Sequence, residues 1–374
     1  MNSIKQIAVK FHCNDLGGKV WNPALRWTKK FAVFVELTDD VGRLGLGECW
    51  CFDSAPDALI AFLRTEVAPH FIGQPIESAE QIMRERIQFA TLSARHGMLA
   101  SALSGFDIAI WDLRAQQQNL PLWKLLNKQG SGQVSLYASG GLYGENKSNE
   151  DLAVEMLGLS QQGFRINKMK VGALSFEEDL ARINGVLAVL PVAAKLIVDC
   201  VYRYDFATVM KLFGELPQDR IEALQSPLAA HEFDGMSSLV EAGVPVMANE
   251  AEYREELHRE LVERNAVRFL QVSPIACGGI SRIIALAALV SDTPIQLSLE
   301  VSSTAVALMA AAHLAATDKH IAPVEYHTIH QVFFDRLPLR QVADGDGVYT
   351  LPATSGLGIV LPKDGLAKGF ELSS

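Results

Sequence analysis

The segment 165–172 reads RINKMKVG, and its two lysines, Lys168 and Lys170, are separated by one residue. Apolar residues around a closing glycine, Gly172, predict a short strand here, and side chains alternate along a strand. Both ammonium groups are therefore expected on one face. Two like charges held so close disfavour each other's protonation, so one lysine is a candidate base near neutral pH. The alternative is a solvated pair on an edge strand.

Short β-rich runs alternate with amphipathic helical runs on both sides of this segment. Helical spacing is clear in 176–190, 206–216 and 280–290. Eight strand candidates separated by helices are typical of a barrel of parallel strands, an α/β fold whose active site lies at the carboxyl ends of the strands. The candidates are 134–139, 166–171, 195–200, 221–226, 244–248, 268–273, 295–299 and 321–326.

The rest of the chain predicts two further parts. Residues 1–127 are expected to form an α+β domain, because a hairpin (31–37 and 43–49) precedes helical segments at 56–63, 78–89 and 97–118. Residues 128–336 would hold the barrel. The Gly- and Pro-rich segment 337–374 is expected to pack back on the first domain.

Composition excludes several classes of function. The formal net charge of -10 argues against nucleic acid and anionic membrane as partners. Neither a signal peptide nor an apolar stretch approaching 18 residues is present, and the five scattered cysteines suit reduced thiols. We therefore expect a cytoplasmic protein with no membrane contact.

Polar residues recur where the predicted strands end. A strand buried on both faces should end in apolar residues unless it faces a site, so this ring favours a functional site over a solvated edge. After Lys168 and Lys170 the ring continues with Asp199, Gln225, Asn249, Ser273 and the segment from Ser298 to Glu300.

Three of these residues offer oxygen ligands to a hard cation such as Mg²⁺: Asp199, Gln225 and Asn249. Only Asp199 is anionic, so tight binding would need a further charge from the substrate or from Glu250. Glu250 would point away in a regular strand but can turn inward at a strand end. The alternative is a hydrogen-bonded lining without metal.

Several motifs resemble the enolase superfamily, in particular its mandelate racemase and muconate lactonizing enzyme branch, over almost the whole chain. They are 45–48 (GLGE), 102–113 (ALSGFDIAIWDL), 120–122 (LPL), 277–281 (CGGIS) and 355–358 (SGLG). The resemblance implies a (β/α)7β barrel, similar to a TIM barrel, under an N-terminal capping domain that the C-terminal segment completes. It also implies a homo-oligomer.

The resemblance implies that a base removes the proton α to a carboxylate, with Mg²⁺ stabilising the intermediate. Lys168 and Lys170 match the family's Lys-x-Lys, in which the second lysine is the base and the first supports it. Asp199 matches the first metal ligand. Gln225 and Asn249 stand where the family has carboxylates, and Ser273 stands where the lysine groups carry the opposite base. One-base reactions, elimination or cycloisomerisation, therefore suit this chain better than racemisation.

Other site residues follow from position. Glu300 is a candidate acid at the seventh strand, or a charge at a helix start. Capping-domain loops select substrate in the family, so the candidates for the entrance are Trp21, Asn22, Arg26, Trp50, Phe52 and Asp53. At the strand ends, Ser273 and Ser298 are further candidates for substrate binding. Arg26 would pair with a substrate carboxylate. The chain is thus expected to be an enzyme acting on a small carboxylate, or else a non-catalytic, metal-free descendant that binds a small anion through Lys168 and Lys170.

Overall fold

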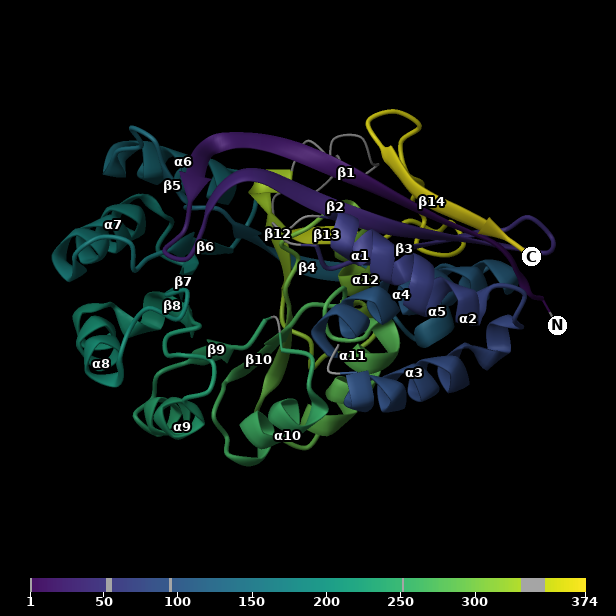
Figure 1. The fold of residues 1–374 in the computed structure, drawn as a ribbon. Coiled ribbons are helices and arrows are strands. Elements are labelled where there is room, and N and C mark those ends of the chain that lie inside the picture. Colours follow the sequence, from purple (N-terminus) through teal and green to yellow (C-terminus); the bar gives the residue numbers. More distant parts are fainter. Residues whose placement is uncertain (1, 52–55, 94–95, 251, 331–346) are drawn as a thin grey trace.

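The barrel predicted from the sequence is present in the computed structural model, which describes residues 2–51, 56–93, 96–250, 252–330 and 347–374. Within the described residues, eight parallel strands form the ring (Figure 1), and a bridge between Leu297 and Ile321 joins its two edges. In order around the ring they are β4 (Gln133–Ser139), β6 (Ile166–Lys170), β7 (Lys195–Asp199), β8 (Ile221–Gln225), β9 (Val246–Ala248), β10 (Phe269–Val272), β11 (Gln296–Leu299) and β12 (Val324–His327).

In the part of the chain that the structure describes, seven helices separate these strands and complete a (β/α)7β barrel. Several begin at a side chain that accepts a backbone N–H of the first turn, as Ser148, Ser175, Asp205 and Thr304 do. The helices are α6 (Asn149–Gln161), α7 (Phe176–Val189), α8 (Phe206–Glu215), α9 (Phe233–Glu241), α10 (Glu255–Glu263), α11 (Gly279–Val290) and α12 (Ala305–Ala315), with a short 3-10 turn, η3 (Gln218–Arg220), before β8 and another, η4 (Thr328–His330), after β12.

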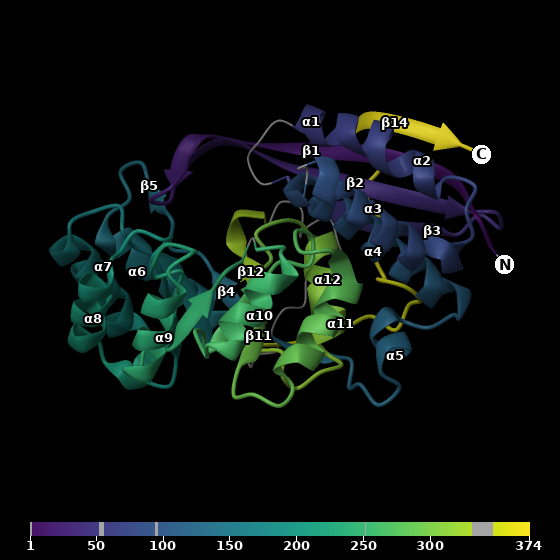
Figure 2. The same ribbon diagram turned by 60° about the horizontal axis from the view of Figure 1, so that its bottom comes forward.

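An antiparallel sheet with helices on one face forms the capping domain (Figure 2). Its strand order is β14 (Ala367–Ser373), β1 (Ile4–Trp21), β2 (Arg26–Asp39) and β3 (Leu44–Cys49), so the predicted hairpin is confirmed and the chain's last strand pairs with its first. The helical elements are α1 (Pro56–Phe62), η1 (Leu63–Val67), α2 (Ala68–Phe71), η2 (Ile76–Ser78), α3 (Ala79–Ser93), α4 (His96–Gln117) and α5 (Leu122–Leu126). Strand β13 (Val348–Thr350) pairs with β4 of the barrel.

The glycines of the 45–48 motif are required by close packing of β3 on α4. A Cβ at Gly45 would lie 2.2 Å from the carbonyl oxygen of Ala109, and one at Gly47 would lie 1.9 Å from the carbonyl oxygen of Gly105. Only glycine lets the strand and the helix approach so closely.

Two buried aspartates of helix α4 connect it to the barrel, to β3 and to the C-terminal segment. Asp107 accepts hydrogen bonds from the backbone N–H and hydroxyl of Ser281, at the start of α11. Asp112 accepts the N–H of Leu46 on β3 at 2.9 Å and the N–H of Leu357 in the C-terminal segment at 2.8 Å. The motifs that suggested the family thus meet at one helix.

The β1–β2 hairpin is long enough to reach across the barrel mouth (Figure 1). Near its tip, Trp21 pairs with Tyr143 of β5 (Tyr143–Gly144), a short strand after β4, and the two rings stack. Strand β1 was not predicted, because its second half, with Asn14, Asp15, Gly17 and Gly18, lacks an apolar alternation. Among the described residues, no helix is both long and apolar enough to cross a membrane.

Candidate active site

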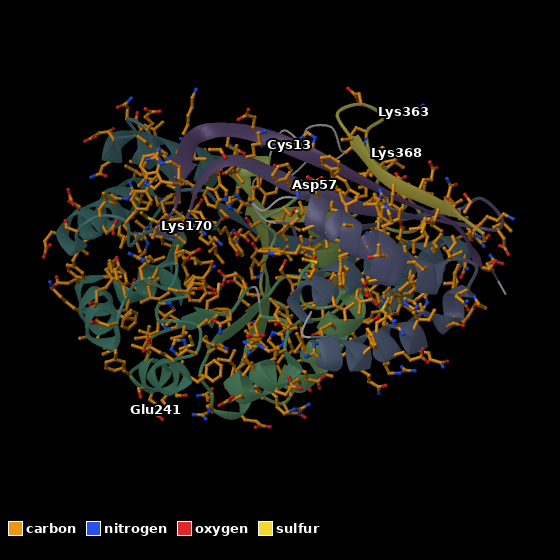
Figure 3. The ribbon with its side chains drawn as sticks, in the orientation of Figure 1. Cys13, Asp57, Lys170, Glu241, Lys363 and Lys368 are labelled. Atoms are coloured by element: carbon orange, nitrogen blue, oxygen red, sulfur yellow. The ribbon has the colours of Figure 1, made fainter. Side chains whose placement is uncertain are left out.

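A cavity of about 240 Å³ opens at the carboxyl ends of the barrel strands, beneath the β1–β2 hairpin. The hairpin contributes Asn22, Ala24, Leu25 and Trp27, and the capping domain adds Trp50. The barrel contributes Lys168, Lys170, Asp199, Val201, Tyr202, Gln225, Glu250, Glu300, Ser302, Glu325 and His327. The cavity therefore has a mainly apolar roof from one domain and a charged floor from the other, and Figure 3 shows Lys170 near the tip of the hairpin.

Both lysines of β6 face this cavity, as the alternation predicted, and a carboxylate lies between them. The ammonium of Lys170 contacts Oδ2 of Asp199, and Nζ of Lys168 is 3.8 Å from the same oxygen. Asp199 ends β7, the neighbouring strand, in register with Lys170. The like charges are thus screened by a shared counter-ion rather than left facing each other.

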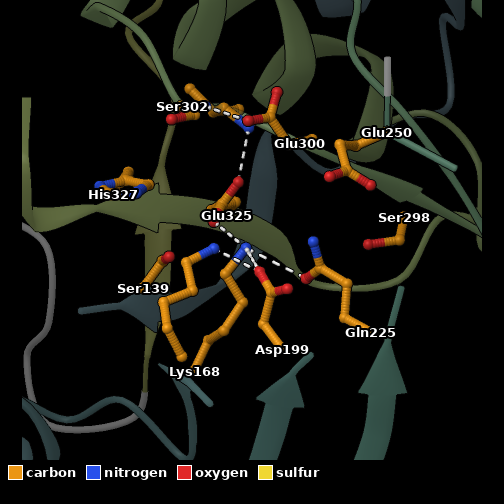
Figure 4. A network of polar contacts seen from close by, with 12 residues as sticks. Ser139, Lys168, Asp199, Gln225, Glu250, Ser298, Glu300, Ser302, Glu325 and His327 are labelled. Atoms are coloured by element: carbon orange, nitrogen blue, oxygen red, sulfur yellow. Dashed lines mark hydrogen bonds and ion pairs between the residues drawn. The ribbon is translucent and has the colours of Figure 1, made fainter. Parts of the chain in front are cut away.

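Lys168 is the more buried of the two lysines, and its partners are shown in Figure 4. Its ammonium lies 2.5 Å from Oε1 of Glu325 on β12 and donates to Oε1 of Gln225 at 3.1 Å. Burial acts most strongly and lowers the pKa of Lys168, but the charges of Glu325 and Asp199 and the hydrogen bond to Glu325 are among the influences that together outweigh it and raise that pKa well above its usual value. Lys168 is therefore a fixed cation, which leaves Lys170 as the candidate base.

Glu250, rather than Asn249, faces the cavity. The amide nitrogen of Asn249 donates to the carbonyl of Ala230 at 3.0 Å, and Asn249 does not line the cavity. The carboxylate of Glu250 accepts from the hydroxyls of Tyr202 at 2.7 Å and Ser226 at 3.0 Å. The strand end thus turns Glu250 inward and presents a second carboxylate beside Asp199.

The residues present fit Mg²⁺ better than the sequence suggested. Asp199, Gln225 and Glu250 line one cavity and offer two carboxylates and an amide oxygen, a hard oxygen set of the kind Mg²⁺ takes. Four carboxyl groups, of Asp199, Glu250, Glu300 and Glu325, line the cavity with the two ammonium groups of β6, so the site carries enough acidic groups to favour a bound cation.

The turn after β7 is held in a strained conformation. Val201 and Tyr202 have φ values of 48° and 59°, in the left-handed region that β-branched and aromatic residues rarely adopt. Such strain, of order 1–3 kcal/mol per residue, concentrates at functional sites. Here it brings Tyr202 over the cavity to its hydrogen bond with Glu250.

Glu300 lines the cavity just after β11, in the ring of polar strand ends. Its Oε1 accepts the N–H of Ser302 at 2.9 Å, and its buried Oε2 has no hydrogen-bond partner among the described residues. Burial, reinforced by the charge of Glu325, raises the pKa of Glu300 to about 8. These surroundings favour the protonated carboxyl group, which has a proton to donate.

Lys30, from β2 of the capping domain, approaches the same loop from outside the cavity. It is 2% exposed, and its ammonium donates to the carbonyl oxygen of Ser302 at 2.8 Å and to its hydroxyl at 2.7 Å. Burial lowers the pKa of Lys30 to about 7, although the charges of Glu300 and Glu325 act in the opposite direction.

Several residues predicted from sequence lie outside the described cavity. Ser273 is buried with its hydroxyl directed at the carbonyl of Glu300 at 3.4 Å, and Ser298 lies next to Met247. Arg26 stacks over Trp21, 4.0 Å from the ring centroid, and donates to the carbonyl of Gly18. Their substrate-binding roles stay predictions, and Phe52 and Asp53 lie outside the described residues. Trp50 and Asn22 do line the cavity.

Sequence reasoning missed three charged or titratable residues. Glu325 and His327 alternate at the end of the eighth strand, so the period-two pattern that identified Lys168 and Lys170 would also have placed both of them inward. Burial and the nearby ammonium groups keep the pKa of His327 well below its usual value, so this ring is neutral. Lys30 carried no such signal, because its role depends on contact between two domains.

Known proteins resemble this chain over nearly its whole length. D-galactarolactone cycloisomerase of Agrobacterium fabrum is 28% identical over 92% of this chain and 93% of its own. Arabinonate dehydratase of Saccharolobus solfataricus is 25% identical over 91% of each. The crystal structure of L-talarate dehydratase from Polaromonas sp. JS666, complexed with Mg and L-glucarate, matches all of both chains with a TM-score of 0.85 at 22% identity.

Family models cover both domains. The enolase C-terminal domain-like model matches residues 151–365, and the model of the mandelate racemase and muconate lactonizing enzyme N-terminal domain matches residues 26–127. The first match alone spans more than half of the chain. The chain belongs to the enolase superfamily, in its mandelate racemase and muconate lactonizing enzyme branch.

Proposed function

We propose that this chain removes the proton α to the carboxylate of a small polyhydroxy acid, with Lys170 as base, and expels an oxygen from the neighbouring carbon with Glu300 as acid. The observation that carries the proposal is that both groups line one cavity. They come from different strands of the ring, Lys170 from β6 and Glu300 from the end of β11. A molecule between them is accessible to a base and an acid from different sides.

Lys170 is the better base of the two lysines. It lies on the cavity wall and forms an ion pair with Asp199, whereas Lys168 is 1% exposed and held by Glu325. The fixed charge of Lys168 would instead stabilise negative charge that develops on the substrate carboxylate as the proton leaves. Asp199, Gln225 and Glu250 would hold Mg²⁺, which supplies Lewis-acid polarisation of that carboxylate.

The proton balance closes without a further reactant. Lys170 takes the α-proton, the electron pair of that bond forms a carbon–carbon double bond, and the bond to the leaving oxygen breaks. Glu300 gives its proton to that oxygen, so a hydroxyl group departs as water or a ring oxygen remains as a hydroxyl. Exchange with solvent then removes the proton from Lys170 and returns one to Glu300.

The relatives support a sugar acid as the substrate class. The two compared enzymes are named for a sugar lactone and a sugar acid, and the matched crystal structure holds L-glucarate. The polar floor of the cavity suits hydroxyl groups, while Trp27, Leu25 and Trp50 exclude water from above.

Proton exchange in deuterated water tests the proposal even before the product is identified. A panel of aldonic acids, aldaric acids and their lactones is incubated with the protein and Mg²⁺, and the α-proton is followed by ¹H NMR. We expect at least one acid to lose its α-proton signal. Lys170→Met should abolish this loss, while Glu300→Gln should allow α-exchange but slow formation of the eliminated product.

A matched control separates chemistry from folding. Lys195→Met removes a lysine from the opposite end of the barrel, where Lys195 is half exposed and pairs with Glu222. Its exchange rate should equal that of the wild type. Undiminished exchange in Lys170→Met would contradict the assignment of the base, and no exchange with any acid would contradict the proposed reaction.

A further inference from the structure

Two buried, ionisable side chains of the capping domain hold the loop that follows β11. Lys30 on β2 binds Ser302 through both its carbonyl and its hydroxyl. Glu48 on β3 accepts from Ser303, from Thr304 and from the backbone N–H of Ala307 at the start of α12. The β11–α12 loop is therefore fixed from the capping side by side chains that do not themselves line the described cavity.

The same loop fixes Glu300 from within. The N–H of Ser302 donates to Oε1 of Glu300, so Ser302, which Lys30 binds, also orients the carboxyl group. Ser302 therefore connects the ammonium of Lys30 to the carboxyl of Glu300 through hydrogen bonds. This connection occupies Oε1 and leaves Oε2 of Glu300 without a partner among the described residues.

Burial of Lys30 in this position needs an explanation. Burying a lysine to 2% exposure costs free energy unless its amine is hydrogen-bonded or paired with an anion. No local pattern in the sequence predicted this burial. Lys29, its neighbour, is exposed on the other face of the strand. The chain thus places one lysine of the capping sheet against the barrel, next to the proposed acid of the site.

We propose that Lys30 is a positioning residue for Glu300: it holds Ser302, whose N–H donates to Oε1 of Glu300, and so orients the carboxyl group toward the cavity. The inference rests on the proposed role of Glu300 as the acid. It also gives the capping domain a direct part in the chemistry, beyond covering the site.

Several other titratable groups lie near Lys30 and Glu300, and a test must leave them in place. The groups that face Glu300 or Lys30 come from several elements or their ends: Glu48 on β3, Lys168 and Lys170 on β6, Glu250 after β9, and Glu325 and His327 on β12. All of these remain when Lys30 alone is changed.

The test reads the proton on Glu300 directly. Protein labelled with ¹³C at the glutamate carboxyl carbons is titrated by NMR, and the Glu300 signal is assigned from Glu300→Gln. Lys30→Met should raise the titration midpoint of Glu300 by at least about 0.5 pH unit, because the N–H of Ser302 that stabilises the ionised carboxyl group is no longer held in place. Lys30→Arg, which keeps hydrogen-bond donors for Ser302, should stay closer to the wild type. Lys29→Met serves as the control and should leave the midpoint unchanged.

Kinetics provide a second readout once a substrate is known. Lys30→Met should lower kcat by about tenfold or more with little change in KM, because Lys30 does not touch the cavity. In the Glu300→Gln background the same substitution should have no further effect on kcat. An unchanged or lowered midpoint in Lys30→Met would overturn the inference. An active Glu300→Gln enzyme with a normal elimination rate would instead overturn the proposed acid, so the two failures are distinguishable.

Discussion

The ammonium nitrogen of Lys168 lies 2.5 Å from a carboxylate oxygen of Glu325, inside the barrel and away from solvent. The two residues come from β6 and β12, which are separated by β4 in the ring and lie far apart in the sequence. The pair links the second and last strands of the barrel across the first, and closes the polar floor of the site. Its anion also helps to keep the pKa of Lys168 well above its usual value.

Glu325→Gln should destabilise the protein strongly. It leaves the ammonium of Lys168 buried without its nearest anion, which costs about 3–5 kcal/mol in comparable pairs. Urea unfolding at pH 7 would measure the loss. Glu222→Gln, which breaks the surface pair with Lys195, should cost under about 1 kcal/mol. Equal losses in the two variants would show that the buried pair contributes no more than a surface one.

Glu300→Gln should change how stability depends on pH. The native state holds the Glu300 proton up to about pH 8, whereas a glutamate without this burial releases it near 4.5. Between these values the native state binds more protons than the unfolded state, so the free energy of unfolding falls as pH rises, by up to about 1.4 kcal/mol per pH unit. The variant lacks this decline.

Urea unfolding of wild type and Glu300→Gln at pH 5.5, 7 and 8.5 measures that difference. The variant should gain stability relative to the wild type at each step upward in pH. Parallel pH dependence in the two proteins would place the Glu300 proton outside this range. With substrate, wild-type elimination should also decline above about pH 8, as the acid loses its proton.

Glu48→Gln should weaken the contact between the capping domain and the barrel. Glu48 accepts from three donors at the start of α12, and an amide nitrogen in its place would face one of them. We expect a loss of about 1–3 kcal/mol, since a buried donor is left without an acceptor. Hydrogen exchange should accelerate at the first turn of α12. Glu371→Gln, which removes a surface pair with Lys368, is the control and should leave both measurements unchanged.

Glu250→Gln should weaken divalent metal binding more than Asn249→Ala does. Glu250 lines the cavity with Asp199 and Gln225, whereas Asn249 is bonded to Ala230. Calorimetry with Mn²⁺ on chelator-treated protein should show at least about a tenfold weaker Kd for Glu250→Gln, because ligand charge governs affinity for hard cations. The reverse order would make Asn249 the ligand, as its place in the sequence suggested.

Periodicity predicted the barrel because a parallel strand buried on both faces has a strong local signature. The eight predicted runs correspond to β4 and β6 through β12, with ends that differ by a few residues. Strand β1 escaped prediction, since its polar second half gains its strand structure from pairing with β2 and β5. Pairing partners far away in sequence leave little trace in local composition.

The sequence alone determined that Lys168 and Lys170 share a face, because alternation is a property of any strand, and that Asp199 ends the next strand along. Tertiary structure decided the rest of the site. The turn at the end of β9 selected Glu250 over Asn249, ring closure brought Glu325 to Lys168, and contact between two domains brought Lys30 to Ser302. Each of these depends on where separate elements meet, which no local pattern of residues specifies.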